Sequence, residues 1–321
     1  MDNHILLSIA SIGVLGIACQ WFAWWVRIPS ILFLLTTGIL AGPILGLLNP
    51  DILLGDLLFP FISLSVAVIL FEGSLTLKFS EIRGHGKIVS NLVTIGALIT
   101  WAIVGYSTYH LLDLSMELAF LFGAIVVVTG PTVIIPILRI VRPNPKVANV
   151  LRWEGIVIDP LGALLAVLVF DFIISGQQHN VLSTMLLAFG KIILSGFLIG
   201  FISAWSLGSL LRKQLVPQYL RNIFTLISVL TVFVLSEMIQ SESGLLAVTV
   251  MGITMANMKD MDIDNILDFK ESLSVLLISV LFIVLAARIE IDELIFVGWP
   301  AIVLLGIIIL IARPVAVFAS S

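Results

Sequence analysis

The stretch Trp153-Glu154-Gly155-Ile156-Val157-Ile158-Asp159-Pro160 places two carboxylates inside an apolar run that is long enough to cross a membrane. Asp159 lies near the middle of that run, about 14 Å from its start near Val150 at 1.5 Å per residue. A carboxylate at that depth in a bilayer is costly, so it is a functional-site hypothesis by default. The preceding run is interrupted by Thr129-Gly130-Pro131. Together these features predict ion transport at a site near the middle of the membrane.

Only 11% of the 321 residues are charged, 60% are hydrophobic, and the mean hydropathy is +1.20. A soluble domain carries about twice that charged fraction. We therefore expect an all-α, polytopic membrane protein in which residues 1–321 form a single transmembrane domain, with no soluble domain. Nucleotide-binding glycine motifs, metal-binding Cys/His spacings and hydrolase triads are absent from the sequence. These absences indicate no enzyme activity, no cofactor and no nucleic-acid partner.

Apolar runs that are mostly long enough for a membrane-spanning helix, about 20 residues, occur eleven times. The expected helices are 5–26, 29–48, 57–77, 88–112, 117–138, 148–174, 185–211, 220–240, 244–258, 270–287 and 294–319.

Basic residues concentrate on one side of this arrangement, because 13 of the 16 Lys and Arg residues follow odd-numbered helices or open the next one. Lys and Arg concentrate in cytoplasmic loops by the positive-inside rule. The loops that lead from an odd-numbered helix of this list to the next even-numbered one (the odd-to-even loops) are therefore cytoplasmic, and the N-terminus is outside. The expected location is the cell (inner) membrane. The 13 residues are Arg27, Lys78, Arg83, Lys87, Arg139, Arg142, Lys146, Arg152, Arg212, Lys213, Arg221, Lys259 and Lys270.

The fifth run carries the interruption. Pro131 has no N–H and clashes with the carbonyl of Val127, while Gly130 permits unusual backbone dihedrals. Thr129 is about 16 Å from the outer end, so freed carbonyls there need partners within the protein or in a watery cavity. Interrupted helices at this depth coordinate ions in many secondary transporters. Alone, the interruption is equally typical of a packed proline kink; the carboxylate in the next helix favours the ion site.

Small residues share the helix face of Asp159, with Gly155 four residues before it and Gly162 three residues after it. They would let the interrupted segment approach the carboxylate. Pro160 frees the carbonyl of Ile156, and oxygen ligands suit a hard cation such as Na⁺. We therefore predict Asp159, as a transient metal ligand, and Thr129 as the ion-binding residues. The supporting positions are Glu72, Gly130, Pro131, Gly155 and Ile156.

Two further charged positions have competing interpretations. Glu154 is about 140° away from Asp159 around the helix, and Arg313 lies at a similar depth, which favours an ion pair between them over an Arg313 that snorkels to the interface. Glu72 could provide a second carboxylate in the cytoplasmic entrance to the ion site, or its side chain could extend to water. The sequence does not decide between these.

At these residues the chain resembles the NhaP-type and NHE-like sodium/proton antiporters of the monovalent cation/proton antiporter superfamily. Phe71-Glu72-Gly73-Ser74-Leu75 resembles the family's Phe-Glu-Gly-Gly-Leu stretch, and Thr129-Gly130-Pro131 occupies the place of Thr-Asp-Pro. The stretch from Glu154 to Asp159 occupies the place of a Glu followed by Asn-Asp, and Ala312-Arg313-Pro314 resembles the helix with the buried Arg. Thus Gly130 replaces an Asp and Ile158 replaces the Asn.

The resemblance implies an inverted-repeat fold with dimerisation helices, a mobile ion-translocating core, alternating access and a homodimer. Family members continue for two more helices, so the resemblance also suggests that this chain is a fragment. The expected function is Na⁺/H⁺ antiport, in which Asp159 binds either a proton or a cation and a 1:1 exchange moves no net charge. The alternatives are K⁺/H⁺ antiport, a truncated membrane fragment that does not transport, and, with least support, a channel.

Overall fold

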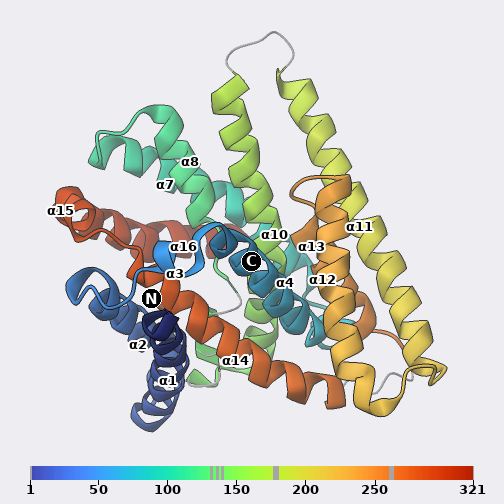
Figure 1. The fold of residues 1–321 in the computed structure, drawn as a ribbon. Helices are drawn as coiled ribbons and strands as arrows, with labels where there is room; N and C mark the ends of the chain where they lie inside the picture. The colour runs from blue at the N-terminus through green and yellow to red at the C-terminus, as the bar shows by residue number, and fades with distance from the viewer. Residues whose placement is uncertain are drawn as a thin grey trace.

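The computed structural model describes residues 2–130, 133–134, 137–138, 141–175, 181–259 and 264–320, and within them it contains helices but no strand (Figure 1). The first half comprises α1 (Asp2–Val26), α2 (Ser30–Ile39), η1 (Leu40–Ile44), α3 (Pro50–Leu54), η2 (Gly55–Leu57), α4 (Leu58–Leu75), α5 (Phe79–Ile82), α6 (Gly86–Asn91), η3 (Leu92–Gly96), α7 (Ala97–Leu111) and α8 (Met116–Val126). The second half comprises α10 (Pro145–Ser175), α11 (Val181–Arg212), η4 (Gln218–Leu220), α12 (Arg221–Ile239), α13 (Gly244–Ala256), α14 (Asp264–Ala287), α15 (Ile291–Ile307), η5 (Ile308–Ala312) and α16 (Arg313–Ser320).

The all-α, polytopic architecture is confirmed. Among the described residues, 7 helices are long and apolar enough to cross a membrane, and four shorter apolar helices accompany them. Each of the eleven expected runs corresponds to one of these. Three of the runs expected to be plain α-helix contain a π-helical turn, at η1, η3 and η5, which the apolar pattern did not indicate. Such turns add one residue to a helical turn and are frequent near functional sites.

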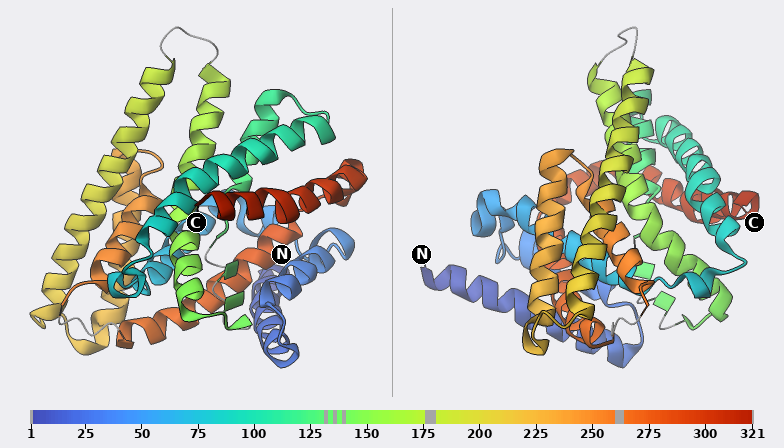
Figure 2. Two further views of the ribbon diagram at one scale, coloured as in Figure 1. Left: turned by 180° about the vertical axis from the view of Figure 1, so that it is seen from behind. Right: turned by 90° about the vertical axis from the view of Figure 1, so that its right-hand side faces the viewer.

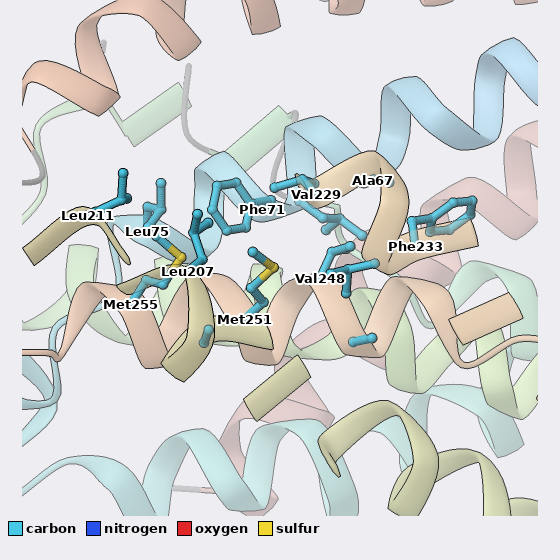
Figure 3. Packing of buried hydrophobic residues seen from close by; sticks show 14 of the residues in the cluster. Ala67, Phe71, Leu75, Leu207, Leu211, Val229, Phe233, Val248, Met251 and Met255 are labelled. Carbon is cyan, nitrogen blue, oxygen red and sulfur yellow. The ribbon is translucent and has the colours of Figure 1, made fainter. Parts of the chain in front are cut away.

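One hydrophobic cluster joins α4, α11, α12 and α13, with Phe71, Met251 and Met255 fully buried (Figure 3). Close approach of α4 to α13 depends on Gly252. A Cβ placed there would lie 2.5 Å from Cβ of Ser74 and 2.7 Å from the carbonyl oxygen of Phe71. The helices touch through their backbones, as is common between membrane helices.

A second cluster joins α1, α2 and α4 to α14. Gly38 lies against the backbone of Ile283, and Gly42 lies against that of Ala287, so α2 and η1 also pack with almost no side chain between them and α14. Figure 2 shows α14 running from the side of α11–α13 to the side of α1 and α2. α14 therefore holds the two halves of this scaffold together.

α7, α8 and α10 form a third packed group. Val127, just beyond α8, is buried with Ala97 of α7 and Ile158 of α10. Trp101 of α7 donates its indole N–H to the carbonyl of Phe120 in α8 at 2.8 Å. This packing fixes the end of α8 beside the middle of α10, where the two expected site elements meet.

The turn between α12 and α13 is closed by an acidic side chain. Glu237 accepts hydrogen bonds from the N–H groups of Gly244 at 2.8 Å and Glu242 at 2.9 Å. Glu242 lies outside the spans, and its pKa is raised above the usual value by burial, and further by the negative charges of Glu237 and Asp171. The ionised form of Glu242 is therefore disfavoured in the folded protein.

We expect the substitution Gly252→Ala to lower stability by about 1–3 kcal/mol, because the added methyl meets backbone that cannot move aside. Gly190→Ala is the matched control, since nothing lies within 4 Å of a Cβ at Gly190. Thermal unfolding in detergent should show a lower midpoint for Gly252→Ala alone. Equal midpoints for both variants would contradict the close α4–α13 packing.

Glu242 should also make stability depend on pH. Its folded pKa is above the unfolded value of 4.5, so the folded state holds the proton more tightly. Its contribution is complete below pH 4.5 and is lost as the pH rises through the raised value. In Glu242→Gln the unfolding midpoint should fall less over this window than in the wild type. Glu117→Gln, at an exposed position, is the control and should keep the wild-type profile.

Candidate functional site

The helix that leads to Thr129 ends before it. α8 stops at Val126, and Gly130 adopts a φ of +64°, which a glycine can take without steric cost. The N–H of Ile134 then donates to the carbonyl of Gly130 at 3.3 Å, as helical structure resumes. The expected interruption at Thr129-Gly130 is confirmed. Pro131, which we assigned to it, lies outside the described residues.

The interrupted segment packs against α10 at two glycines of that helix. A Cβ on Gly155 would lie 2.9 Å from Cδ1 of Ile134, and a Cβ on Gly162 would overlap Cγ2 of Val128. A larger residue at either position would push the segment away from α10. The interrupted segment therefore packs directly against the helix that carries Asp159, at Gly155 and Gly162.

Glu154 and Asp159 lie on opposite sides of this contact. At about 100° per residue, Asp159 is about 40° from Gly155 in one direction and Glu154 is about 100° from it in the other. The interrupted segment thus runs between them, and each carboxylate faces a different cavity.

Glu154 is only 4% exposed and has two partners. Its Oε1 accepts a hydrogen bond from the hydroxyl of Thr129 at 3.3 Å and lies 3.4 Å from Nη1 of Arg313, so the expected ion pair is present. All three residues line a cavity of about 450 Å³, and His85 and Lys146 lie on its wall. Arg313 is placed there by the π-helical turn η5, which ends immediately before it.

Asp159 lines a separate cavity of about 160 Å³. Among the residues that the structure describes, every other residue on its wall is apolar. Ile62, Val66, Ile69 and Leu70 come from α4, and Leu281, Phe282 and Leu285 come from α14. The carboxylate therefore faces the boundary between α10 and the α4–α14 pair. A hydrocarbon-lined wall offers it no fixed countercharge, so an ion or proton must neutralise it there.

Thr129 and Asp159 were expected to share one ion site. In the structure the Thr129 hydroxyl donates to Glu154 instead, and the two residues line different cavities. The reason is rotational: the segment contacts α10 at Gly155 and Gly162, and the hydroxyl lies on the Glu154 side of that contact.

Ile156, a supporting position, and Ile158 are both buried beside the site. Ile156 is 0% exposed and packs with Leu77 and Trp153. Ile158 is buried against Ala97 and Val127, so it belongs to a hydrophobic cluster and not to the wall around Asp159.

Glu72, near the end of α4, accepts a hydrogen bond from the hydroxyl of Ser274 in α14. Ser274 is 5% exposed, so this end of Glu72 points between the helices. The contact joins the same two helices that line the cavity of Asp159. Sequence reasoning did not identify Ser274, because an isolated serine in an apolar run carries no signal of its partner.

A second unanticipated contact lies at the opposite end of α14. Nε of Arg288 is 3.1 Å from Oδ2 of Asp51, and its guanidinium lies over the ring of Phe59, 5.3 Å from the ring centre. Arg288 thereby ties α14 to α3 and the start of α4. The two residues of the ion pair are too far apart in the chain for any local pattern to join them.

Glu154→Ala should destabilise the protein by about 3 kcal/mol, the lower end of the range for breaking a buried pair, because Arg313 keeps 30% of its side-chain exposure. Glu81→Ala is the control. It removes an ion pair to Arg152 with side chains 36% and 32% exposed, which should cost below about 1 kcal/mol. Thermal unfolding in detergent measures both, and equal losses would refute the structural role of the Glu154–Arg313 pair.

Comparison with known proteins connects this geometry to a family. Residues 7–321 match the family described as "Sodium/hydrogen exchanger, transmembrane". The Na(+)/H(+) antiporter 1 of Methanocaldococcus jannaschii is 29% identical over 326 residues, which span 98% of this chain and 76% of that relative. The K(+)/H(+) antiporter NhaP2 of Shewanella sp. (strain ANA-3) is 27% identical over 295 residues, which span 91% of this chain and 51% of that relative.

The fold agrees with a solved structure. The sodium proton antiporter MjNhaP1 from Methanocaldococcus jannaschii at pH 8 superposes with a TM-score of 0.81 at 26% identity, covering 99% of this chain and 79% of that one. The chain therefore belongs to the sodium/hydrogen exchanger family of multi-pass membrane transporters, which exchange a monovalent cation for protons.

Proposed function

We propose that this chain exchanges Na⁺ for H⁺ across the cell membrane and that Asp159 binds the two ions in turn. The observation that carries this proposal is the single carboxylate of Asp159 in an otherwise apolar cavity between α10, α4 and α14. One carboxylate in such a cavity needs one positive charge. A proton and a metal ion compete for it, and this competition is sufficient for antiport.

The exchange is electroneutral in this proposal. Gly130 contributes no carboxylate where the family has an Asp, and Glu154 is already paired with Arg313. Asp159 is then the one group that changes its ionic partner during the cycle. One proton moves for each monovalent cation, and no net charge crosses the membrane.

Alternating access requires Asp159 to face each side of the membrane in turn. We assign the mobile core to α7, α8, α10 and α16, and the scaffold to α1, α2, α4 and α11–α14. The cavity of Asp159 lies on the boundary between these groups, because α10 supplies the carboxylate and α4 and α14 supply the wall. The scaffold forms the homodimer. The loops that lead from an odd-numbered expected helix to the next even-numbered one are cytoplasmic and the N-terminus is outside, because the basic residues lie mostly in those loops.

K⁺/H⁺ exchange is the second candidate. It is supported by the 27% identity to the NhaP2 proteins of Shewanella, which are named K(+)/H(+) antiporters. The wall around Asp159 offers few fixed oxygen ligands to select a small ion by size. Proton flux driven by equal gradients of Na⁺, Li⁺ and K⁺ in proteoliposomes distinguishes the two candidates.

Asp159→Asn should abolish cation-driven proton flux in proteoliposomes and leave the unfolding midpoint close to that of the wild type, because the amide keeps the size and loses the charge. Asp171→Asn is the matched control on the same helix. Asp171 is exposed near the far end of α10, and its removal should preserve flux. Exchange at the wild-type rate in Asp159→Asn would exclude Asp159 as the ion-binding residue.

A further inference from the structure

Polar contacts hold α14 beside α4 at both ends of the cavity that Asp159 lines. Along the cavity itself, the described wall residues that the two helices contribute are apolar. At one end the hydroxyl of Ser274 in α14 donates to Glu72 in α4. At the other end Arg288 pairs with Asp51 and lies over a ring at the start of α4. These two contacts therefore influence how far α4 and α14 stand apart at the cavity.

The contact between Ser274 and Glu72 is the buried one. Ser274 is 5% exposed, whereas the side chain of Arg288 keeps 35% of its exposure, and exposed ion pairs contribute little. Glu72 is two positions beyond Leu70, which lines the cavity. Ser274 is seven positions before Leu281, about 10 Å along α14 at 1.5 Å per residue. A hydrogen bond to a carboxylate is stronger than one between neutral groups, and low-dielectric surroundings strengthen it further.

The later half of α14 is held by close backbone contacts. Gly38 and Gly42 leave no room for a Cβ against the backbone of Ile283 and Ala287. The glycine contacts that the structure describes on α14 all lie in this later half. Ser274 lies before it. Loss of the Ser274 hydrogen bond would therefore let the earlier part of α14 move away from α4 while the later part stays in place.

The width of this cavity bears on which ion fits beside Asp159. The cavity measures about 160 Å³, and the side chains on its described wall supply no oxygen besides that carboxylate. Ligand number, cavity size and flexibility together decide which cation a site prefers. Where side-chain oxygens are few, the space between the helices becomes the main determinant. A narrow cavity favours Na⁺ over the larger K⁺, and a wider and looser cavity favours it less.

We propose that Ser274 is a positioning residue for cation selection. By holding Glu72, its hydroxyl keeps the earlier part of α14 against α4 and limits the space in which Asp159 binds a cation. Ser274 acts through the distance between two helices and lies outside the described wall of the cavity. This inference rests on the proposed function, because it takes Asp159 as the ion-binding residue.

The test compares the KM for Na⁺ with the KM for K⁺ in cation-driven proton flux of proteoliposomes. In Ser274→Ala the ratio of the KM for K⁺ to the KM for Na⁺ should fall about fivefold, the size of change that loss of one hydrogen bond gives, while kcat changes less. Ser279→Ala is the matched control. Ser279 is 3% exposed on the same helix and accepts a hydrogen bond at 3.0 Å from Gln20 of α1, so its loss loosens α14 from α1 and should keep the ratio.

Failure of this inference differs from failure of the proposed function. A wild-type ratio in Ser274→Ala, or an equal fall in Ser279→Ala, overturns the positioning role and leaves Asp159 as the ion-binding residue. Wild-type exchange in Asp159→Asn overturns the ion site, and the positioning role with it.

Two further measurements keep the inference testable. If Ser274→Ala does not fold, Ser274→Cys keeps a side chain of similar size with a weak donor and should show part of the fall. A wild-type ratio in Ser274→Cys would then overturn the proposal. The rise of the unfolding midpoint with Na⁺ or K⁺ concentration gives the ratio of the two affinities without transport. That ratio should change in the same direction even in a chain that binds cations without exchanging them, and an unchanged ratio contradicts the role of Ser274.

Discussion

A carboxylate buried among apolar helices must be paired, and the pairing of Glu154 organises the centre of this protein. Its Oε1 contacts Thr129 from the interrupted segment and Arg313 from the last helix, which are distant in the chain. The low-dielectric surroundings make separation of these charges expensive. The pair therefore fixes the rotation of α10 about its axis. That rotation in turn decides which direction Asp159 faces.

Asp159 has the opposite environment. It lies on the other side of the contact with the interrupted segment, and its cavity wall is otherwise hydrocarbon. Glu154 and Asp159 are five positions apart on one helix, but they suit different tasks. The carboxylate of Glu154 is paired, and that of Asp159 lines an apolar cavity. The first holds helices in place, and the second exchanges its positive partner. In the proposed mechanism the stability of the Glu154 pair allows Asp159 to change its ion without reorganising the site.

The scaffold around this centre relies on very short distances between backbones. Gly252 on α13 allows contact with α4, and Gly38 and Gly42 allow contact with α14. α14 then contributes to three features: the wall of the Asp159 cavity, the hydrogen bond from Ser274 to Glu72, and a third cavity that Arg27 lines. A small displacement of α14 would alter all three.

The sequence by itself determined the features that depend on local chemistry. Run length and hydropathy located the membrane helices, Gly130 located the interruption, and equal depth in the membrane paired Glu154 with Arg313. It did not show that Thr129 faces Glu154, that Ser274 meets Glu72, or that Arg27 and Arg142 share a cavity. Nor did it show the π-helical turns, each of which rotates the residues that follow. These depend on how each helix is rotated and on which helices become its neighbours, and only tertiary packing decides both.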